Sequence, residues 1–264
     1  MTLPRFHLFE LEDQSWFPNI VRDLATDYLH FMEAKMELHR PVVSVLADAL
    51  RASGTTAVVD LCAGGGGPVV RLQQALTDAG VHARFILTDK FPNQPAFERL
   101  EREHDGIEGY PRPVDATAVP SELQSFRTVF NAFHHFKPPD ARAVLQSAVS
   151  ARQPIGVFEI PERTIPIVIA TMVFVPILVL AVTPFIRPFR WERLLFTYLI
   201  PLVPLTCFWD GFVSQLRAYR PDELRGLAAS LGDVGYEWKA GKVSVSDSRP
   251  PNLTYLVGMP VRFD

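Results

Sequence analysis

Cysteine is scarce in this chain of 264 residues: Cys62 and Cys207 are the two present, and they lie far apart. Two such cysteines exclude a disulfide framework, so a reducing, cytoplasmic location is the default expectation. Positive charge is not in excess either, because the formal net charge is −3. With no basic patch interleaved with aromatic residues, this balance argues against nucleic acid as a partner. Residues 1–17 contain acids and lack an apolar run, so we expect no signal peptide.

Apart from an apolar stretch after residue 164, helical and strand-like patterns alternate along the chain. Such alternation indicates βαβ units and a parallel sheet. We expect helices at residues 18–38, 41–52, 68–80, 95–104, 139–151 and 221–231, and a short helical segment that opens at Ser121. We expect strands at residues 57–61, 83–88, 109–114, 128–133, 155–160, 236–245 and 253–257, the last two joined by a polar loop at 246–252.

The first of these strands ends near an aspartate and is followed by consecutive glycines, in the run VVDLCAGGGGPVVRL at residues 58–72. A glycine-rich turn before a helix lets a ligand approach bare backbone at the helix N-terminus. A dinucleotide would place its pyrophosphate there, where the Asp60 carboxylate repels it, whereas S-adenosylmethionine carries an ammonium and a sulfonium. The dinucleotide fingerprint G-x-G-x-x-G is also absent, because Cys62 occupies the position of its first glycine. The alternative is a tight turn that binds no ligand.

Two further acids follow the next two predicted strands. Asp89 ends the run FILTD, where a carboxylate can accept hydrogen bonds from both hydroxyls of an adenosine ribose. Asp115 follows the weak third strand in VDATAVP and could accept from the adenine amino group, although such an aspartate is commonly a turn residue. The order and spacing of Asp60, Asp89 and Asp115 favour S-adenosylmethionine more strongly than any one of them alone.

These motifs resemble those of the class I S-adenosylmethionine-dependent methyltransferase superfamily. The match consists of VVDLCAGGGG, ILTD, VDAT and NAFHHF, and it covers residues 42–151 and again 221–261. The resemblance implies a doubly wound α/β fold, with a mostly parallel seven-stranded sheet whose antiparallel last strand is inserted beside the fifth. Cys62 departs from the family, which usually has its first glycine there, and no subfamily motif matches. The candidate cofactor-binding residues are Asp60, Cys62, Ala63, Gly64, Gly65, Gly66, Asp89, Lys90, Asp115, Ala116 and Asn131, the last of them to orient the methionine portion.

Methyl transfer from a sulfonium depends mainly on positioning, so a general base is optional. His134 and His135 follow the fourth predicted strand, where either could deprotonate a hydroxyl or ammonium acceptor. Adjacent histidines on an extended chain point to opposite sides, so we expect no shared metal; the alternative is one backbone-capping histidine and one at the surface. Glu159 ends the fifth strand and could hold a cationic or hydroxyl group, or pair with Arg163 or Arg152. Further candidates for a substrate rim are Tyr28, Asp210, Arg217 and Tyr219.

Residues 164–186 contain no charged side chain, and after RPFRWER a second apolar run extends from 194 to 209. As a helix, residues 165–186 would be about 33 Å long, which matches a hydrocarbon core of roughly 30 Å, whereas the second run is too short to return across it. Prolines interrupt both runs, and arginines lie between them, which favours a shallow, kinked hairpin in one leaflet over a two-span anchor. The alternative is a lid over the active site or a dimer interface. The prolines are Pro166, Pro176, Pro184, Pro201 and Pro204, and the arginines are Arg187, Arg190 and Arg193.

We therefore predict four regions: an N-terminal helical cap (1–40), a Rossmann-like cofactor-binding core (41–163), the apolar insertion (164–209) and the C-terminal part of the core (210–264). The leading hypothesis is a methyltransferase that acts on a lipophilic small molecule at the cytoplasmic side of a membrane, or in the cytoplasm if the insertion is a lid. The alternatives are a non-catalytic relative that binds a membrane or a partner, and an NAD(P)-dependent oxidoreductase, which Asp60 disfavours. The acceptor molecule and the oligomeric state stay open.

Overall fold

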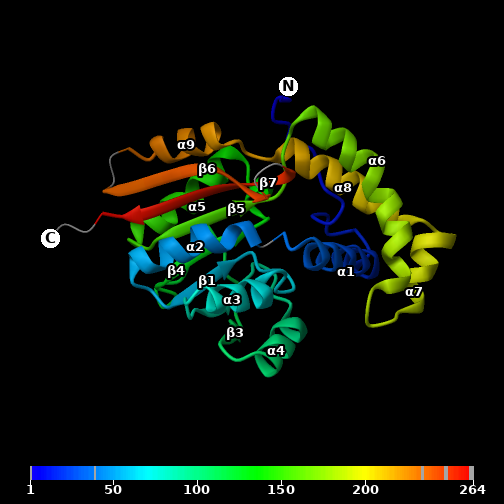
Figure 1. Cartoon of the computed structure of the whole chain (residues 1–264), viewed down its shortest axis with the longest axis horizontal. Coiled ribbons are helices and arrows are strands. Elements are labelled where there is room, and N and C mark those ends of the chain that lie inside the picture. Colours follow the sequence, from blue (N-terminus) through cyan, green and yellow to red (C-terminus); the bar gives the residue numbers. More distant parts are fainter. Residues whose placement is uncertain (1, 39, 233–234, 247–248, 262–264) are drawn as a thin grey trace. The chain divides into compact units, whose positions relative to one another are not determined.

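Seven strands form one mixed sheet in the computed structural model, which describes residues 2–38, 40–232, 235–246 and 249–261 (Figure 1). The strands are β1 (Ala57–Leu61), β2 (Arg84–Leu87), β3 (Ile107–Gly109), β4 (Phe126–Phe130), β5 (Ile155–Glu159), β6 (Tyr236–Ser246) and β7 (Arg249–Pro260). Their order is β3-β2-β1-β4-β5-β7-β6. β1 to β5 run parallel, and β7 is antiparallel to both β5 and β6. The predicted doubly wound sheet, with the last strand inserted beside the fifth, is confirmed.

Helices cover both faces of this sheet. They are α2 (Arg40–Ser53), α3 (Val69–Asp78), α4 (Gln94–Glu103), α5 (Pro138–Ser150) and α9 (Pro221–Ala229). On one face, α2, α3 and α4 share an apolar core with Phe126 of β4. The next residue, Arg127, points to the other face, where its guanidinium donates to Ser147 Oγ of α5 at 3.2 Å. α9 packs against α5.

Three expected elements differ from the structure, each for a local reason. The strand expected at 109–114 lies earlier, as β3, because Pro111 and Pro113 cannot donate to a ladder. Ser121 starts a turn and not a helix. Both β6 and β7 extend into the loop expected at 246–252, and the tip of that loop is outside the described residues.

The chain divides into two compact units. The sheet unit consists of Leu38–Ile160 and Arg220–Asp264, and it contains all the elements named above. The helical unit combines Met1–Glu37 with Pro161–Tyr219. The N-terminal helix and the apolar segment, which are far apart in the sequence, therefore fold together.

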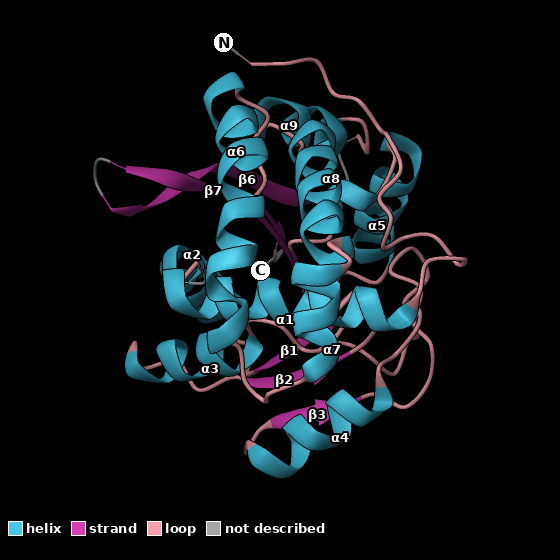
Figure 2. Ribbon diagram, turned by 90° about the vertical axis from the view of Figure 1, so that its right-hand side faces the viewer, coloured by secondary structure: helices cyan, strands magenta, loops and turns pink. Residues whose placement is uncertain are grey.

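The helical unit is built from α1 (Asn19–Met36), α6 (Ile165–Val182), the 3-10 turn η2 (Thr183–Phe185), α7 (Trp191–Leu194), the π-helical turn η3 (Leu195–Leu199) and α8 (Leu202–Arg217). α6 and α8 lie side by side (Figures 1 and 2). α6 continues through Pro176, so the expectation that this proline interrupts the helix is wrong. A proline removes one N–H donor, but its fixed φ is helical and the remaining bonds of the helix persist. Pro201 does separate two helices, because the segments on either side of the break are bent by 74°.

Candidate active site

The loop after β1 has three residues in the left-handed region, Cys62, Gly64 and Gly66, with φ of 61°, 55° and 87°. Glycine adopts this conformation freely, whereas a residue such as Cys62 pays about 1–2 kcal/mol for it. A Cβ atom at Gly64 would meet nothing within 4 Å, but one at Gly66 would lie 2.2 Å from Leu100 Cδ1 of α4. Gly64 therefore presents bare backbone to open space, and Gly66 instead lets α4 pack against the loop.

Asp60 lies beneath this loop and is 3% exposed. Its Oδ1 accepts a hydrogen bond from Thr128 Oγ1 at 2.9 Å. Burial raises the pKa of Asp60 to about 8; the Thr128 hydrogen bond lowers it and the charge of Asp89 raises it. The carboxyl group therefore holds its proton near neutral pH, and a cation placed beside it would favour release of that proton.

Asp89 follows β2 and ties the glycine loop to it. Its Oδ2 accepts the Gly64 N–H at 2.9 Å, and its Oδ1 accepts the Phe91 N–H at 2.8 Å. Each carboxylate oxygen has a further lone pair, so the group can accept additional hydrogen bonds from a ligand. The ring of Phe91 is 83% exposed next to this carboxylate. Phe91 was not among the candidates selected from the sequence.

Asp115 is the turn residue that the sequence alternative described, and its role toward adenine stays a prediction. Its Oδ1 accepts from Thr117 Oγ1 at 2.6 Å and from the Thr117 N–H at 2.9 Å, which shapes a turn. Its Oδ2 accepts from Lys90 Nζ at 2.9 Å. The Thr117 and Lys90 hydrogen bonds lower the pKa of Asp115 to about 2, so it stays ionised. The adjacent Ala116 is buried.

Four acidic residues act electrostatically on the Cys62 thiol. Burial is the largest cause of its raised pKa, and the charges of Asp89, Asp60, Asp115 and Glu159 each raise it further. The thiol therefore stays protonated and is not a nucleophile. Asp89 and Asp115 place negative charge near the loop, and Asp60 adds to it when a cation favours its ionised form, so these residues fit a cationic ligand better than a pyrophosphate.

The segment after β4 forms the 3-10 turn η1 (Phe133–His135), so the extended chain expected there is wrong. The turn begins after Asn131, which has a φ of 52°, and it is closed by the His135 N–H donating to Ala132 O at 3.2 Å. Because the chain curls, the rings of His134 and His135 do not point to opposite sides. Their centroids are 4.4 Å apart.

Glu159, at the end of β5, is fully buried and holds this turn with both carboxylate oxygens. Oε1 accepts the Phe133 N–H at 2.8 Å, and Oε2 lies 2.6 Å from His134 Nδ1. Because an ionised carboxylate only accepts, Nδ1 carries the proton in this pair and Nε2 is the basic atom of the ring. Glu159 thus pairs with a histidine, and neither arginine considered from the sequence is its partner among the described residues.

The four candidates for a substrate rim belong to the helical unit and are buried there. Tyr28 lies in its core, and burial raises the pKa of the phenol. Asp210 accepts two backbone N–H groups of the N-terminal segment at 2.6 and 3.1 Å. Arg217 pairs with two acids of that segment at 2.9 and 3.2 Å, and the Arg5 guanidinium lies 3.9 Å from the centroid of the Tyr219 ring. These contacts hold the N-terminal segment against α8, and a role toward substrate stays a prediction.

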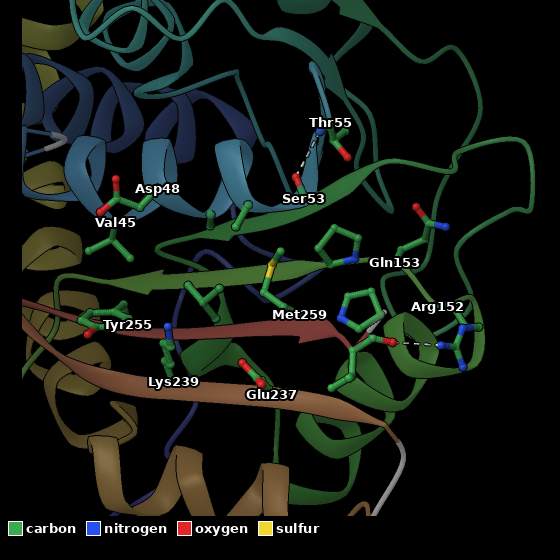
Figure 3. A pocket seen from close by; sticks show the side chains of 16 residues that line it. Val45, Asp48, Ser53, Thr55, Arg152, Gln153, Glu237, Lys239, Tyr255 and Met259 are labelled. Carbon is green, nitrogen blue, oxygen red and sulfur yellow. Dashed lines mark hydrogen bonds between the residues drawn. The ribbon is translucent and has the colours of Figure 1, made fainter. Parts of the chain in front are cut away.

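A cavity of about 760 Å³ lies elsewhere in the sheet unit (Figure 3). α2 forms one wall, and β6 and β7 contribute apolar residues such as Val257 and Met259 together with Lys239 and Glu237. Residues 152–154, which precede β5, line it as well. Glu159 is at the C-terminal end of β5, whereas these residues precede its N-terminal end. The cavity is therefore near the N-terminal ends of the parallel strands, and the glycine loop is at their C-terminal ends.

No protein-family model matches this chain, and no curated protein matches its sequence. Solved structures do match its fold. The plantazolicin methyltransferase BpumL, in complex with a triazolic desmethylPZN analog and SAH, aligns with a TM-score of 0.55 at 10% identity, over 95% of this chain and 97% of its own. The methyltransferase domain of bacterial CtHen1-CN aligns with a TM-score of 0.51 at 12% identity, over 84% and 99%. The chain therefore has the class I methyltransferase fold, with no particular subfamily indicated.

Proposed function

We propose that this chain is an S-adenosylmethionine-dependent methyltransferase that acts on a lipophilic small molecule at the cytoplasmic side of a membrane. The observation that carries the proposal is the glycine loop. Gly64 offers bare backbone to open space, and the nearby acidic residues favour a cation over a phosphate. On a class I methyltransferase fold, this combination fits S-adenosylmethionine and disfavours a dinucleotide.

The residues present can hold each part of that cofactor. Asp89 has lone pairs for the two ribose hydroxyls, and Asp115 with Lys90 offers an ionised acceptor and a donor for the adenine. Asp60 and Asn131 lie at the ends of β1 and β4, where the ammonium of the methionine portion would be neutralised and oriented. When bound, S-adenosylmethionine supplies a methyl group on a positively charged sulfur, so the acceptor needs an available lone pair.

The pair of His134 and Glu159 suits removal of a proton from the acceptor. Glu159 is fixed by the Phe133 N–H, and it fixes the histidine ring through Nδ1 in turn. This arrangement directs basicity to Nε2 and stabilises the imidazolium that forms when Nε2 takes a proton. We assign His134 the role of general base and Glu159 that of a positioning residue, and His135 is the alternative base.

The apolar surface of the helical unit supports a lipophilic acceptor. The segment Ile165–Phe185 has a mean hydropathy of 2.8, and 11% of it is buried. A water-soluble acceptor gives no reason for such a surface. BpumL, with its bound desmethylPZN analog, is a precedent for a small-molecule acceptor on this fold.

The cofactor assignment is tested with two matched glycine variants. Gly64→Val and Gly80→Val each place a side chain at a left-handed glycine where a Cβ meets nothing within 4 Å, but Gly80 lies in the turn after α3. The backbone strain is therefore similar, and melting temperatures should fall alike. Calorimetry should show S-adenosylhomocysteine binding lost or weakened more than about 30-fold, roughly 2 kcal/mol, in Gly64→Val alone. Equal affinity in the two variants would contradict the assignment, and so would tight NADH binding by the wild type.

Turnover is tested separately, because cofactor binding does not prove catalysis. Purified protein is incubated with methyl-labelled S-adenosylmethionine and a lipid and metabolite extract, and labelled products are separated by chromatography. We expect label in the organic phase, dependent on His134. A protein that binds the cofactor but labels no product would be the non-catalytic relative.

A further inference from the structure

One side of the helical unit is continuously apolar. The large apolar residues exposed along α6 form an apolar stripe that consists of Ile169, Met172, Val173, Phe174, Ile177 and Leu180. Past the end of α6, the exposed aromatic residues Phe185, Phe189 and Trp191 continue this surface to the turn that leads into α8. The stripe itself contains no polar residue, and aromatic residues at its end are typical of a membrane border.

α1 of the same unit exposes charged side chains, which α6 lacks. α1 contributes Val21, Leu24 and Tyr28 to a core shared with α6 and α8. Its exposed residues include Asn19, Asp23 and Lys35 together with Leu29 and Met36. The unit is therefore asymmetric: α1 presents charged side chains to water, whereas the apolar stripe is exposed in the described part of the chain without a charged residue.

An ion pair between the buried Arg193 and the partly exposed Asp27 ties the turn between α6 and α8 to the middle of α1. The Arg193 side chain is 2% exposed, and its NH2 group donates to Asp27 Oδ2 at 2.6 Å. Its NH1 group donates to the carbonyls of Ile186 and Pro188, both at 3.0 Å, which closes the turn around the guanidinium. Arg190 adds a second contact with Asp27 at 3.6 Å.

This ion pair is incompatible with a spanning hairpin. If α6 crossed a bilayer, the turn would lie on the far side and would bring the middle of α1 with it. Asp23 and its exposed polar neighbours would then enter hydrocarbon, where charged side chains are strongly disfavoured. The alternative keeps α1 in water and places the apolar stripe alone among acyl chains.

We infer that the helical unit binds the surface of a lipid bilayer as a monotopic module, with α6 along the membrane plane and the apolar stripe inserted into one leaflet. The inference rests on the membrane contact in the proposed function and adds its topology. Such a helix inserts to a depth of about 5–10 Å. A lipophilic acceptor could then reach the enzyme from the leaflet without crossing water.

Binding is tested by flotation of the full chain with phosphatidylcholine–phosphatidylglycerol liposomes. The double variant Phe174→Glu/Ile177→Glu changes two residues of the apolar stripe that are 58% and 55% exposed. Leu29→Glu is the matched control, because Leu29 is 48% exposed but lies on α1. We expect the wild type and the control to float and the double variant to lose at least tenfold in bound fraction. Melting temperature and S-adenosylhomocysteine affinity verify that each variant is folded.

Topology is tested with Arg187→Cys, at the exposed turn, in protein bound to the outside of sealed liposomes. A membrane-impermeant maleimide should label this cysteine to the same extent before and after detergent is added, as it should label Asn19→Cys on α1. Labelling of residue 187 only after detergent would overturn the monotopic arrangement in favour of a span. Wild-type protein that does not float, or that covers the stripe by dimerising in light scattering, would overturn the membrane contact itself. Because cofactor affinity is measured on the same samples, either result leaves the methyltransferase proposal to its own test.

Discussion

Replacement of Asp60 by asparagine should remove a pH dependence from the stability of the sheet unit. Burial raises the pKa of Asp60 to about 8 from its ordinary value of 3.8. Between these two values the folded state holds a proton that the unfolded state has released, so stability falls as pH rises. One proton corresponds to a slope of up to about 1.4 kcal/mol per pH unit. Asparagine resembles the neutral acid and can still accept from Thr128, so it should lack this slope.

The measurement is the free energy of unfolding by urea at pH 5, 6 and 7 for the wild type, Asp60→Asn and Asp105→Asn. Asp105 is an exposed aspartate in the turn before β3, so its variant should follow the wild type. We expect the advantage of Asp60→Asn over the wild type to grow by about 1 kcal/mol per pH unit in this interval. A constant difference across pH would refute the argument that burial keeps this carboxyl protonated. Addition of S-adenosylhomocysteine should reduce the difference, since its ammonium favours the ionised form of Asp60.

Three further changes follow from the same geometry. Asp89→Ala should weaken cofactor binding by roughly 1–3 kcal/mol in calorimetry. Asp89→Asn should restore this affinity only in part, because one amide oxygen cannot accept from both N–H groups that the carboxylate now binds. Wild-type affinity in either variant would place the ribose elsewhere. His134→Ala should lose turnover while it keeps cofactor affinity. Glu159→Gln should lower kcat with a smaller change in KM. Normal turnover in both variants would make the pair structural. Cys62→Gly should raise the free energy of unfolding by up to about 1 kcal/mol because it relieves left-handed strain, and a loss of stability in thermal melts would contradict that reading.

Much of the site was predictable from the sequence, because its parts are encoded locally. Asp60, Asp89 and Asp115 each follow or end a strand, and the carboxyl ends of parallel strands meet at one edge of a sheet. The alternation of strands and helices therefore predicts that these three acids lie close together. The glycine loop was equally local, since only backbone without side chains suits such a turn.

The sequence could not distinguish the glycines from one another. Gly64 and Gly66 look equivalent in a run of four, yet one faces open space and the other accommodates Leu100, a residue 34 positions further along the chain. Nor did it indicate that the two histidines lie in a 3-10 turn, because an expected strand was extended three residues too far into NAFHHF. The turn depends on Glu159, which arrives from the next strand of the sheet.

What the sequence by itself determined is the order of strands and helices, the acids at the strand ends, and the presence of a long segment too apolar for an ordinary surface. The tertiary structure alone decided which groups pair across long sequence distances. Glu159 pairs with His134 and not with Arg152 or Arg163. Arg193 pairs with Asp27, which lies 166 positions earlier in the chain. Local patterns fix hydrophobic faces, whereas these pairs form only when the packing of distant elements brings their atoms within hydrogen-bond distance and shields at least one partner from water.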